Sequence, residues 1–231
     1  NLYRAVEVTG GPAEGFTSAQ AQAALKEVAA EVLPDDMTYS WNAMSYQEEK
    51  ASGPLAIILS FSLVFVFLIL AAQYESWSLP FAILLGTPFA IFGAMFALWA
   101  ARWFSPTFEN NIFAQVSLVM LIGMAAKNAI LIVEFANDEF KKGLTLFDAA
   151  IAAAKSRFRP ILMTAFSFIL GVFPLVVASG TGSESRKVMG MALLGGMTLA
   201  TLLGVFLYPM LFVFIGKIAG YEKKRKLNSE L

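Results

Sequence analysis

Long stretches without charge alternate with short polar stretches over most of the chain. No charged residue lies between Lys50 and Glu75, and four further runs with little or no charge follow. The hydrocarbon core of a bilayer takes about 20 apolar residues of helix, at about 1.5 Å per residue. The pattern therefore predicts a mainly α, polytopic membrane protein with a transmembrane domain at 51–220. We expect its five transmembrane helices at about 55–74, 79–101, 111–135, 160–178 and 188–216.

The first 50 residues are polar enough for water and carry a different pattern. Two alternating stretches, from Tyr3 to Val8 and from Met37 to Asn42, are typical of short strands. Between them Thr17 and Gln20 have the spacing of a capping box, which predicts an amphipathic helix that ends at about Val32. We expect a small β-α-β piece at 1–50, too small to be a whole domain.

Composition supports a membrane protein and excludes several chemistries. Of 231 residues, 58% are hydrophobic and 15% are charged, which is unusual for a soluble domain. The 17 basic and 17 acidic residues balance, so we expect no nucleic-acid partner. The chain has no cysteine and no histidine, which excludes disulfides, thiol chemistry and Cys/His zinc sites. We expect no cofactor and no signal peptide, and we interpret the chain as part of a longer protein.

Basic residues gather on one side of the predicted bundle. Five crossings put the two termini on opposite sides of the membrane, and the more basic side is expected to be cytoplasmic. We therefore expect a cytoplasmic tail at 221–231 and residues 1–50 outside. The segment 138–155 is amphipathic and has basic flanks, which predicts a helix on the cytoplasmic surface in contact with lipid. The basic residues of this side are Lys141, Lys142, Lys155, Arg157, Arg159, Lys217, Lys223, Lys224, Arg225 and Lys226.

Lys127 is the one charged residue that falls clearly inside a predicted span. An ionisable side chain at that depth indicates a functional site, whereas the simpler alternative is a lysine that extends to the cytoplasmic interface. Small residues around it allow other helices to approach, so we expect Lys127 to face the bundle. No other span carries a carboxylate. Either the amine is neutral or its counter-charge lies outside this chain, and we favour the second. The small neighbours are Gly123, Ala125, Ala126 and Ala129.

Thr164 is the strongest polar candidate in the fourth predicted span. It follows Arg157 by seven residues, which places both on nearly the same helical face. The pair could form a path from the cytoplasm to the membrane interior. The alternatives are a threonine that bonds back to its own helix and an arginine that anchors lipid headgroups.

Other patterns in the spans indicate packing. Pro88 and Pro174 are expected to kink or loosen their helices. Met120 and Met124 share a helical face and could bind a soft metal, but such methionines more often fill packing gaps. Small residues at every fourth position of the last span predict a close helix seam. They are Ala192, Gly196, Ala200 and Gly204.

Four motifs in order along the chain resemble one known family. They are Trp41 to Glu48, Ala72 to Trp77 (AQYESW), Ala126 to Ala136 (AKNAILIVEFA) and Arg159 to Thr164 (RPILMT). As a set they are similar to the resistance-nodulation-division superfamily, in its AcrB-like hydrophobe/amphiphile efflux branch. The resemblance implies that residues 1–50 end a periplasmic porter subdomain and that the five spans are the last five of twelve.

The resemblance also implies an assembly and a role for each candidate residue. It implies a homotrimer in the bacterial inner membrane, working with a periplasmic membrane-fusion adaptor and an outer-membrane channel. Lys127 matches the lysine of the family's proton relay, Thr164 its threonine, and Arg157 an arginine on the cytoplasmic side of the proton path. Asn128 lies in the same motif. The two relay aspartates belong to the family's first half, and we expect them in the missing N-terminal part of the same protein.

The expected function is proton-driven efflux of drugs and other hydrophobic or amphiphilic small molecules, with a role in antibiotic resistance. Metal-exporting relatives carry another residue at the position of Lys127, which weighs against metal substrates. Export of lipids or other hydrophobic metabolites would use the same relay. A membrane structural module without transport is a different class of function. No enzyme activity is expected, since no span holds paired acids or a Ser/His arrangement.

Overall fold

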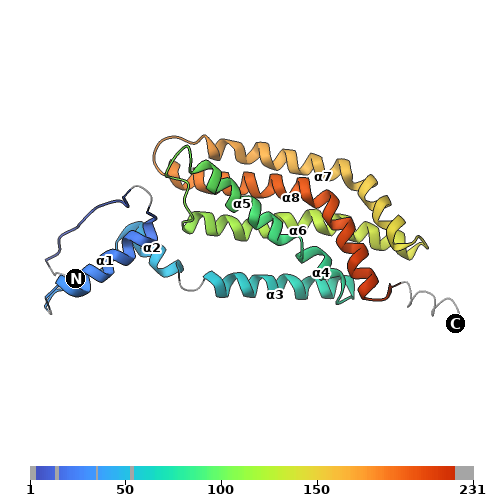
Figure 1. The fold of residues 1–231 in the computed structure, drawn as a ribbon, viewed down its shortest axis with the longest axis horizontal. Helices are drawn as coiled ribbons and strands as arrows, with labels where there is room; N and C mark the ends of the chain where they lie inside the picture. Colours follow the sequence, from blue (N-terminus) through green and yellow to red (C-terminus); the bar gives the residue numbers. More distant parts are fainter. Residues whose placement is uncertain (1–3, 14–15, 35, 53–54, 222–231) are drawn as a thin grey trace.

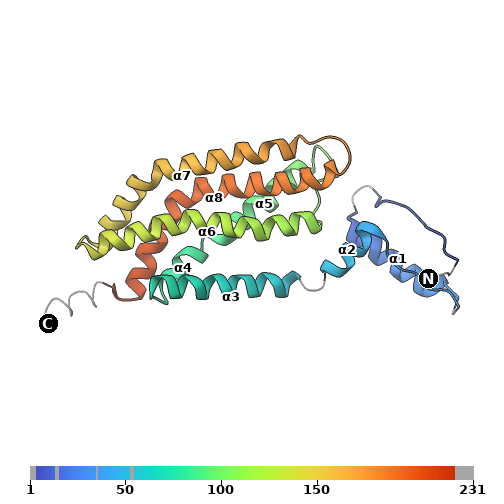
Figure 2. The same cartoon turned by 180° about the vertical axis from the view of Figure 1, so that it is seen from behind.

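The computed structural model describes residues 4–13, 16–34, 36–52 and 55–221, and all regular secondary structure within them is helical. Figure 1 shows a bundle with α1 and α2 at one end, and Figure 2 shows the same arrangement from behind. The N-terminal segment and the end of α8 lie at opposite ends of this bundle. The helices are α1 (Ser18–Val32), α2 (Ala43–Ser52), α3 (Leu55–Tyr74), α4 (Leu79–Leu84), α5 (Thr87–Ala101), α6 (Ile112–Lys141), α7 (Leu146–Val176) and α8 (Ser183–Ile218).

Four stretches of the described chain are long and apolar enough to cross a membrane. They are Leu79–Ala101, Ile112–Lys141, Leu146–Val176 and Ser183–Ile218. These stretches correspond to the second to fifth predicted spans and confirm a polytopic membrane architecture. The first predicted span coincides with α3, but the apolar part found there, Ser60–Tyr74, is shorter. The crossing by α3 therefore stays a prediction.

The second crossing is made of two helices instead of one. Its first part, α4, ends at Leu84, and α5 begins at Thr87 with Pro88 in its first turn. A proline ring clashes with the carbonyl group four residues earlier and has no N–H group to donate to it, so a continuous helix through Leu84 and Pro88 is unfavourable. The expected effect of Pro88 is therefore confirmed, as a break between two helices.

The segment 138–155 is not a separate surface helix. Its first residues continue α6 to Lys141, and the rest belongs to α7, which runs without interruption from Leu146 to Val176. A turn at Gly143, which has a φ of 114°, divides the two helices. The side chain of Thr145 then caps α7 by accepting a hydrogen bond of 3.1 Å from the Asp148 N–H group. The sequence pattern hid the division because both pieces are amphipathic.

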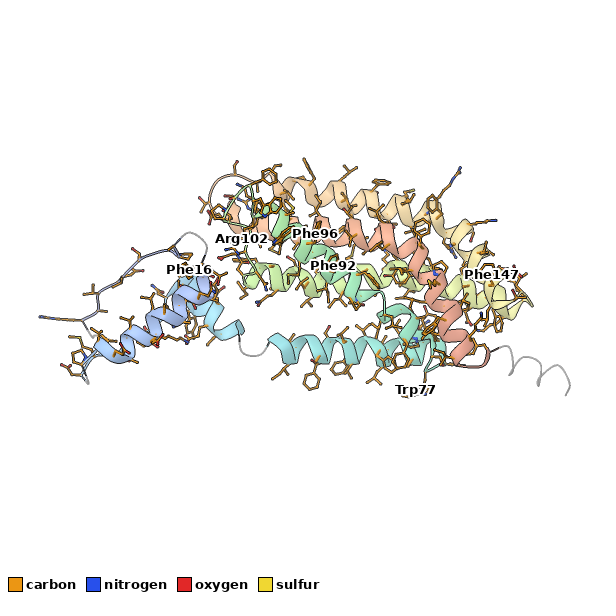
Figure 3. The ribbon with its side chains drawn as sticks, in the orientation of Figure 1. Phe16, Trp77, Phe92, Phe96, Arg102 and Phe147 are labelled. Carbon is orange, nitrogen blue, oxygen red and sulfur yellow. The ribbon has the colours of Figure 1, made fainter. Side chains whose placement is uncertain are left out.

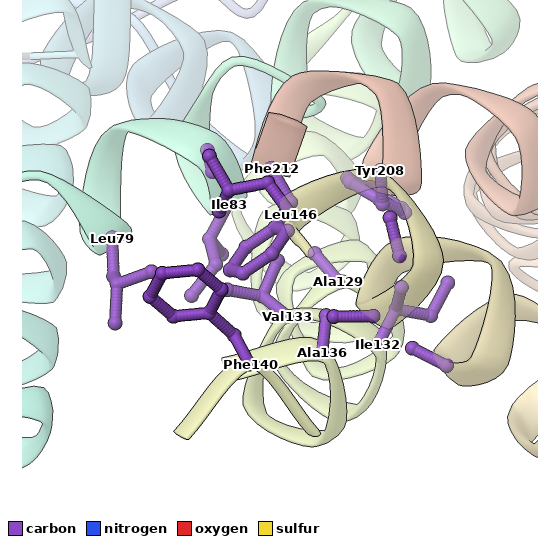
Figure 4. Close-up of a cluster of buried hydrophobic side chains, with 14 of the residues drawn as sticks. Leu79, Ile83, Ala129, Ile132, Val133, Ala136, Phe140, Leu146, Tyr208 and Phe212 are labelled. Atoms are coloured by element: carbon purple, nitrogen blue, oxygen red, sulfur yellow. The ribbon is translucent and has the colours of Figure 1, made fainter. Parts of the chain in front are cut away.

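The core is built around α8, which packs against α5, α6 and α7. One cluster of buried side chains joins the second half of α3, α4, the second half of α6, the first half of α7 and the end of α8 (Figure 4). A second cluster joins α5, the first half of α6, the second half of α7 and the start of α8. The predicted seam on α8 is confirmed, since all four of its small residues are buried. These residues are Ala192, Gly196, Ala200 and Gly204.

The N-terminal segment confirms the predicted helix but not its flanking strands. Thr17 and Gln20 form the expected capping box at the start of α1, which ends at Val32. Residues 4–8 and 37–42 form no strand, and Tyr3 lies outside the described residues. The β-α-β expectation was wrong for these described positions, because a strand needs a partner for its backbone groups and these two stretches do not pair. The helix α2 was not predicted.

Candidate functional site

One face of α6 is buried in the bundle and the other is open. The buried face carries mostly small and aliphatic side chains, which pack in the two core clusters. The open face runs along the full length of the helix and follows the helical period of three or four residues. Its exposed residues are Val116, Met120, Gly123, Lys127, Glu134 and Asp138.

Lys127 lies on the open face, not on the face that packs in this chain. Its neighbours Ala126 and Ala129 are buried, whereas Lys127 itself is exposed and has no hydrogen bond or ion pair with any described residue. A side chain added at Gly123, one turn earlier, would meet nothing within 4 Å. Within this chain the buried small neighbours Ala126 and Ala129 pack on another face of α6, whereas Gly123 shares the open face with Lys127. That Lys127 faces the bundle of the complete protein stays a prediction.

Asn128 lies on the buried face of the same helix. Its side chain is 4% exposed, and its Nδ2 atom has no hydrogen-bond partner among the described residues. An unsatisfied buried amide costs about 1–3 kcal/mol, so such groups persist mainly where they have a further role. Lys127 thus presents an ammonium group on the open face of α6, and Asn128, about 100° further round the helix, presents an amide to the buried face.

Arg157 contacts α6 from the first half of α7. The centre of its guanidinium group lies 4.8 Å from the ring centroid of Phe135, within the range of a cation–π contact. The Nε atom of Arg157 is buried and has no hydrogen-bond partner in the part of the chain that the structure describes. Phe135 was not singled out from the sequence, although it stands in the AKNAILIVEFA motif.

Thr164 lies about 10 Å further along α7 than Arg157, at about 1.5 Å per residue. Its hydroxyl group donates a hydrogen bond of 3.0 Å to the Ile161 carbonyl oxygen, so it bonds back to its own helix. The helices α6 and α7 run antiparallel across a short turn (Figure 1). Arg157 contacts Phe135, and Thr164 follows Arg157 by seven residues on α7. Because α6 runs in the opposite direction, the matching position on α6 lies seven residues before Phe135, at Asn128. Thr164 is therefore level with Lys127 and Asn128 in the bundle.

Acidic and basic residues follow this region toward the end of α6. Lys142 Nζ lies 2.7 Å from Glu139 Oε1, and this hydrogen bond raises the pKa of Lys142 above its ordinary value of 10.5. Glu134 and Asp138 continue the open face that carries Lys127. In the described structure no hydrogen bond or ion pair joins Lys127, Arg157 and Thr164 to one another. Lys127 and Thr164 are related only by their level in the bundle and by their exposure, and Arg157 lies about 10 Å away along α7 with its Nε atom unpartnered among the described residues.

Comparison with known proteins identifies the family. Residues 1–216 match the AcrB/AcrD/AcrF family. The chain is 43% identical over 226 residues to the toluene efflux pump membrane transporter TtgB of Pseudomonas putida, covering 98% of this chain and 21% of that protein. It is 42% identical over 225 residues to the multidrug resistance protein MdtF of Escherichia coli, covering 97% of this chain and 21% of that protein.

A third relative is the multidrug export protein AcrF of Escherichia coli, 42% identical over 216 residues, covering 93% of this chain and 20% of that protein. The chain thus spans about a fifth of the length of the curated relatives it matches. The family match covers residues 1–216, which reach from the N-terminal segment to near the end of α8. It therefore includes all four candidate residues. The chain therefore belongs to the AcrB/AcrD/AcrF family of membrane transporters.

Proposed function

We propose that this chain is the C-terminal membrane part of a proton-driven efflux transporter, in which Lys127 is the central cation of a proton relay. The observation that carries the proposal is the exposed ammonium group of Lys127 on a face of α6 that no described helix of this chain covers. A charged lysine at the centre of a membrane helix costs about 2.5–3.5 kcal/mol on insertion scales. A carboxylate from the rest of the transporter would remove most of this cost.

The relay follows from the chemistry of such a pair. When the partner carboxylate takes up a proton, its attraction for Lys127 is lost, and the ammonium group has to find other partners. Thr164 is level with Lys127 and offers a hydroxyl group that can exchange its bond to the Ile161 carbonyl oxygen for a bond to water. Arg157 stands about 10 Å closer to the proposed cytoplasmic end. Asn128 is buried on another face of α6 and keeps an amide nitrogen that has no partner among the described residues.

The cargo and assembly are proposed from the relatives. TtgB is named as a toluene efflux pump transporter, and MdtF and AcrF as multidrug resistance and export proteins. We assign to this chain the export of drugs and other hydrophobic or amphiphilic compounds, driven by proton influx and not by a bound cofactor. The complete protein would form a homotrimer in the inner membrane, with a periplasmic adaptor and an outer-membrane channel. Residues 1–50 of this chain would lie in the periplasm and residues 221–231 in the cytoplasm.

The test is Lys127→Ala in the full-length transporter. We expect loss of drug resistance and of dye efflux in cells, with expression and oligomeric state unchanged, because the variant removes the relay cation from a face that this chain leaves open. The matched control is Lys155→Ala, which removes an exposed lysine near the start of α7. Normal resistance in the Lys127→Ala cells would overturn the proposal.

A second measurement separates the substrate classes. Purified transporter in proteoliposomes is given a proton gradient and either a fluorescent drug or a fluorescent phospholipid. The proposal expects drug movement that depends on Lys127. Movement of the phospholipid alone would instead indicate an exporter of lipids. A lack of movement of either compound, in a preparation with correct oligomeric state, would favour a structural module.

A further inference from the structure

The helix α3 is held to the rest of the bundle near one end only. In its second half Leu70 is 6% exposed, and Val66 and Tyr74 pack against the first core cluster. In its first half the side chains that the structure describes are largely open, with Ile57 and Phe61 both about 60% exposed. Figure 1 shows this first half standing apart from the other helices. Whatever fixes the second half therefore sets the direction in which the whole helix points.

The turn after α3 is fixed by residues from two distant parts of the chain. The Oγ atom of Ser76 lies 2.9 Å from the hydroxyl oxygen of Tyr221, beyond the end of α8. The ring of Tyr221 stacks on Phe140, near the end of α6, with centroids 6.1 Å apart and planes at 29°. Phe140 itself is buried in the first core cluster. Tyr221 thus joins the α3–α4 turn to the ends of α6 and α8.

The local backbone supports this contact on both sides. Gly220 has a φ of +67°, which ends α8 and turns the chain so that Tyr221 points back to the bundle. On the other side, the Ser76 hydroxyl oxygen also accepts a hydrogen bond of 3.3 Å from the Ser78 N–H group, directly before α4. Glu75 takes a left-handed backbone conformation with a φ of 48°. Ser76 is therefore the residue that organises the turn and also the residue that meets Tyr221.

Trp77 in the same turn does not serve this purpose. Its side chain is exposed and directed away from the bundle (Figure 3). It packs instead on Phe67 of α3, with ring centroids 6.0 Å apart. An aromatic residue in that position is typical of a membrane-interface anchor. The two aromatic residues thus differ in role: Trp77 faces outward, whereas Tyr221 faces two elements of its own chain.

We infer that Tyr221 is a latch that fixes the pivot of α3, so that α3 follows movements of the ends of α6 and α8. The hydroxyl group of Tyr221 holds the α3–α4 turn through Ser76, and its ring holds the end of α6 through Phe140. Because the described side chains Ile57 and Phe61 in the first half of α3 are open within this chain, a small change at this pivot is amplified along the 20 residues of the helix. The first half of α3 then changes its direction whenever this turn moves.

The latch can be tested by measuring where α3 points. Nitroxide labels are placed on α3 at Phe61 and on α5 at Trp99, which are 60% and 54% exposed, in an otherwise cysteine-free full-length transporter in nanodiscs. Double electron–electron resonance gives the distance distribution between them without substrate or a proton gradient. The result therefore does not depend on whether the proposed transport function is correct.

Two conservative variants each remove one side of the hydrogen bond, namely Tyr221→Phe and Ser76→Ala. We expect both to broaden the distance distribution, and the double variant to broaden it no further than Ser76→Ala alone, which also removes the acceptor of the Ser78 N–H group. Tyr221→Ala, which also removes the ring, is expected to broaden it more. The control is Ser78→Ala, whose hydroxyl group makes no hydrogen bond in the described part of the chain, and which should leave the distribution unchanged.

Distributions identical to wild type in Tyr221→Phe, Ser76→Ala and the double variant would overturn the latch. Additive broadening in the double variant would also overturn it, because two residues that act through one bond cannot give independent effects. If Tyr221→Ala fails to fold, the two conservative variants still decide the question, since each removes only one hydroxyl group.

Discussion

A close approach of helices in the bundle, between Gly93 of α5 and α8, makes a sharp prediction for Gly93→Ala. A Cβ atom at position 93 would lie 2.6 Å from Leu199 Cβ, 3.0 Å from the Gly195 carbonyl oxygen and 3.2 Å from Gly196 Cα. Carbon atoms in contact prefer separations of about 3.5–4.0 Å, so the helices have to separate by about 1 Å. None of the three atoms can move without its backbone.

The expected magnitude is a balance of two terms. Overpacking of this kind costs about 1–3 kcal/mol, and alanine in place of glycine within a helix returns about 0.8–1.0 kcal/mol. We therefore expect Gly93→Ala to lower stability by up to about 2 kcal/mol. The matched control is Gly171→Ala in α7, where an added Cβ atom meets nothing within 4 Å and only the favourable term remains.

The assay is the midpoint of thermal unfolding of the purified transporter, followed by size-exclusion chromatography after heating. Gly93→Ala should lower the midpoint by a few degrees, whereas Gly171→Ala should keep or raise it. Equal midpoints for the two variants would refute the reasoning, because they differ mainly in the space around the added methyl group. A raised midpoint for Gly93→Ala would show that α5 and α8 separate at no cost.

Two further changes test features at the ends of helices. Thr145→Ala removes the side chain that caps α7 and should cost about 1 kcal/mol of stability, measured as a lower thermal midpoint, whereas Thr145→Ser should keep the wild-type value. In the N-terminal segment, the hydrogen bond from Lys26 to Glu49, with an N–O distance of 2.6 Å, raises the pKa of Lys26 above 10.5. The contribution of this pair is fully present below pH 10.5 and is lost as the pH rises through the higher pKa of the folded state. Lys26→Gln should therefore lower the unfolding midpoint at pH 8 but not at a pH well above the folded-state value; a difference that persists there would contradict this reasoning.

Hydrophobic periodicity predicted most of the bundle because an apolar run of known length has few alternatives. It placed α6 and α8 well, and the rules for proline and for the capping box gave the break before Pro88 and the start of α1. The start of α7 was misplaced by 14 residues, from Pro160 to Leu146, because a charged amphipathic stretch was interpreted as a separate helix. A helix can continue from a polar surface into an apolar environment without any signal at the boundary.

Less of the candidate site than of the fold could be predicted from the sequence. The position of Lys127 in a span identified the residue, but small neighbours indicate only that some helix approaches, not on which face. The contact between Arg157 and Phe135 joins residues 22 positions apart on two helices, and their pairing depends on where the turn near Gly143 lies. Periodicity gives the face of one helix, whereas contacts between helices depend on their relative rotation and height.

The division of the second crossing into α4 and α5 has a consequence for the thickness of the surrounding bilayer. The two helices have 6 and 15 residues, about 9 Å and 22 Å, and together they only just match a hydrocarbon core of about 30 Å. The 36 residues of α8 extend about 54 Å, so this helix has to tilt or to project into water. A jointed crossing can follow a thinner or thicker membrane by changing the angle at its joint, while the continuous helix beside it keeps its length. Lipids of different chain length should therefore act on this protein first at residues 85 and 86.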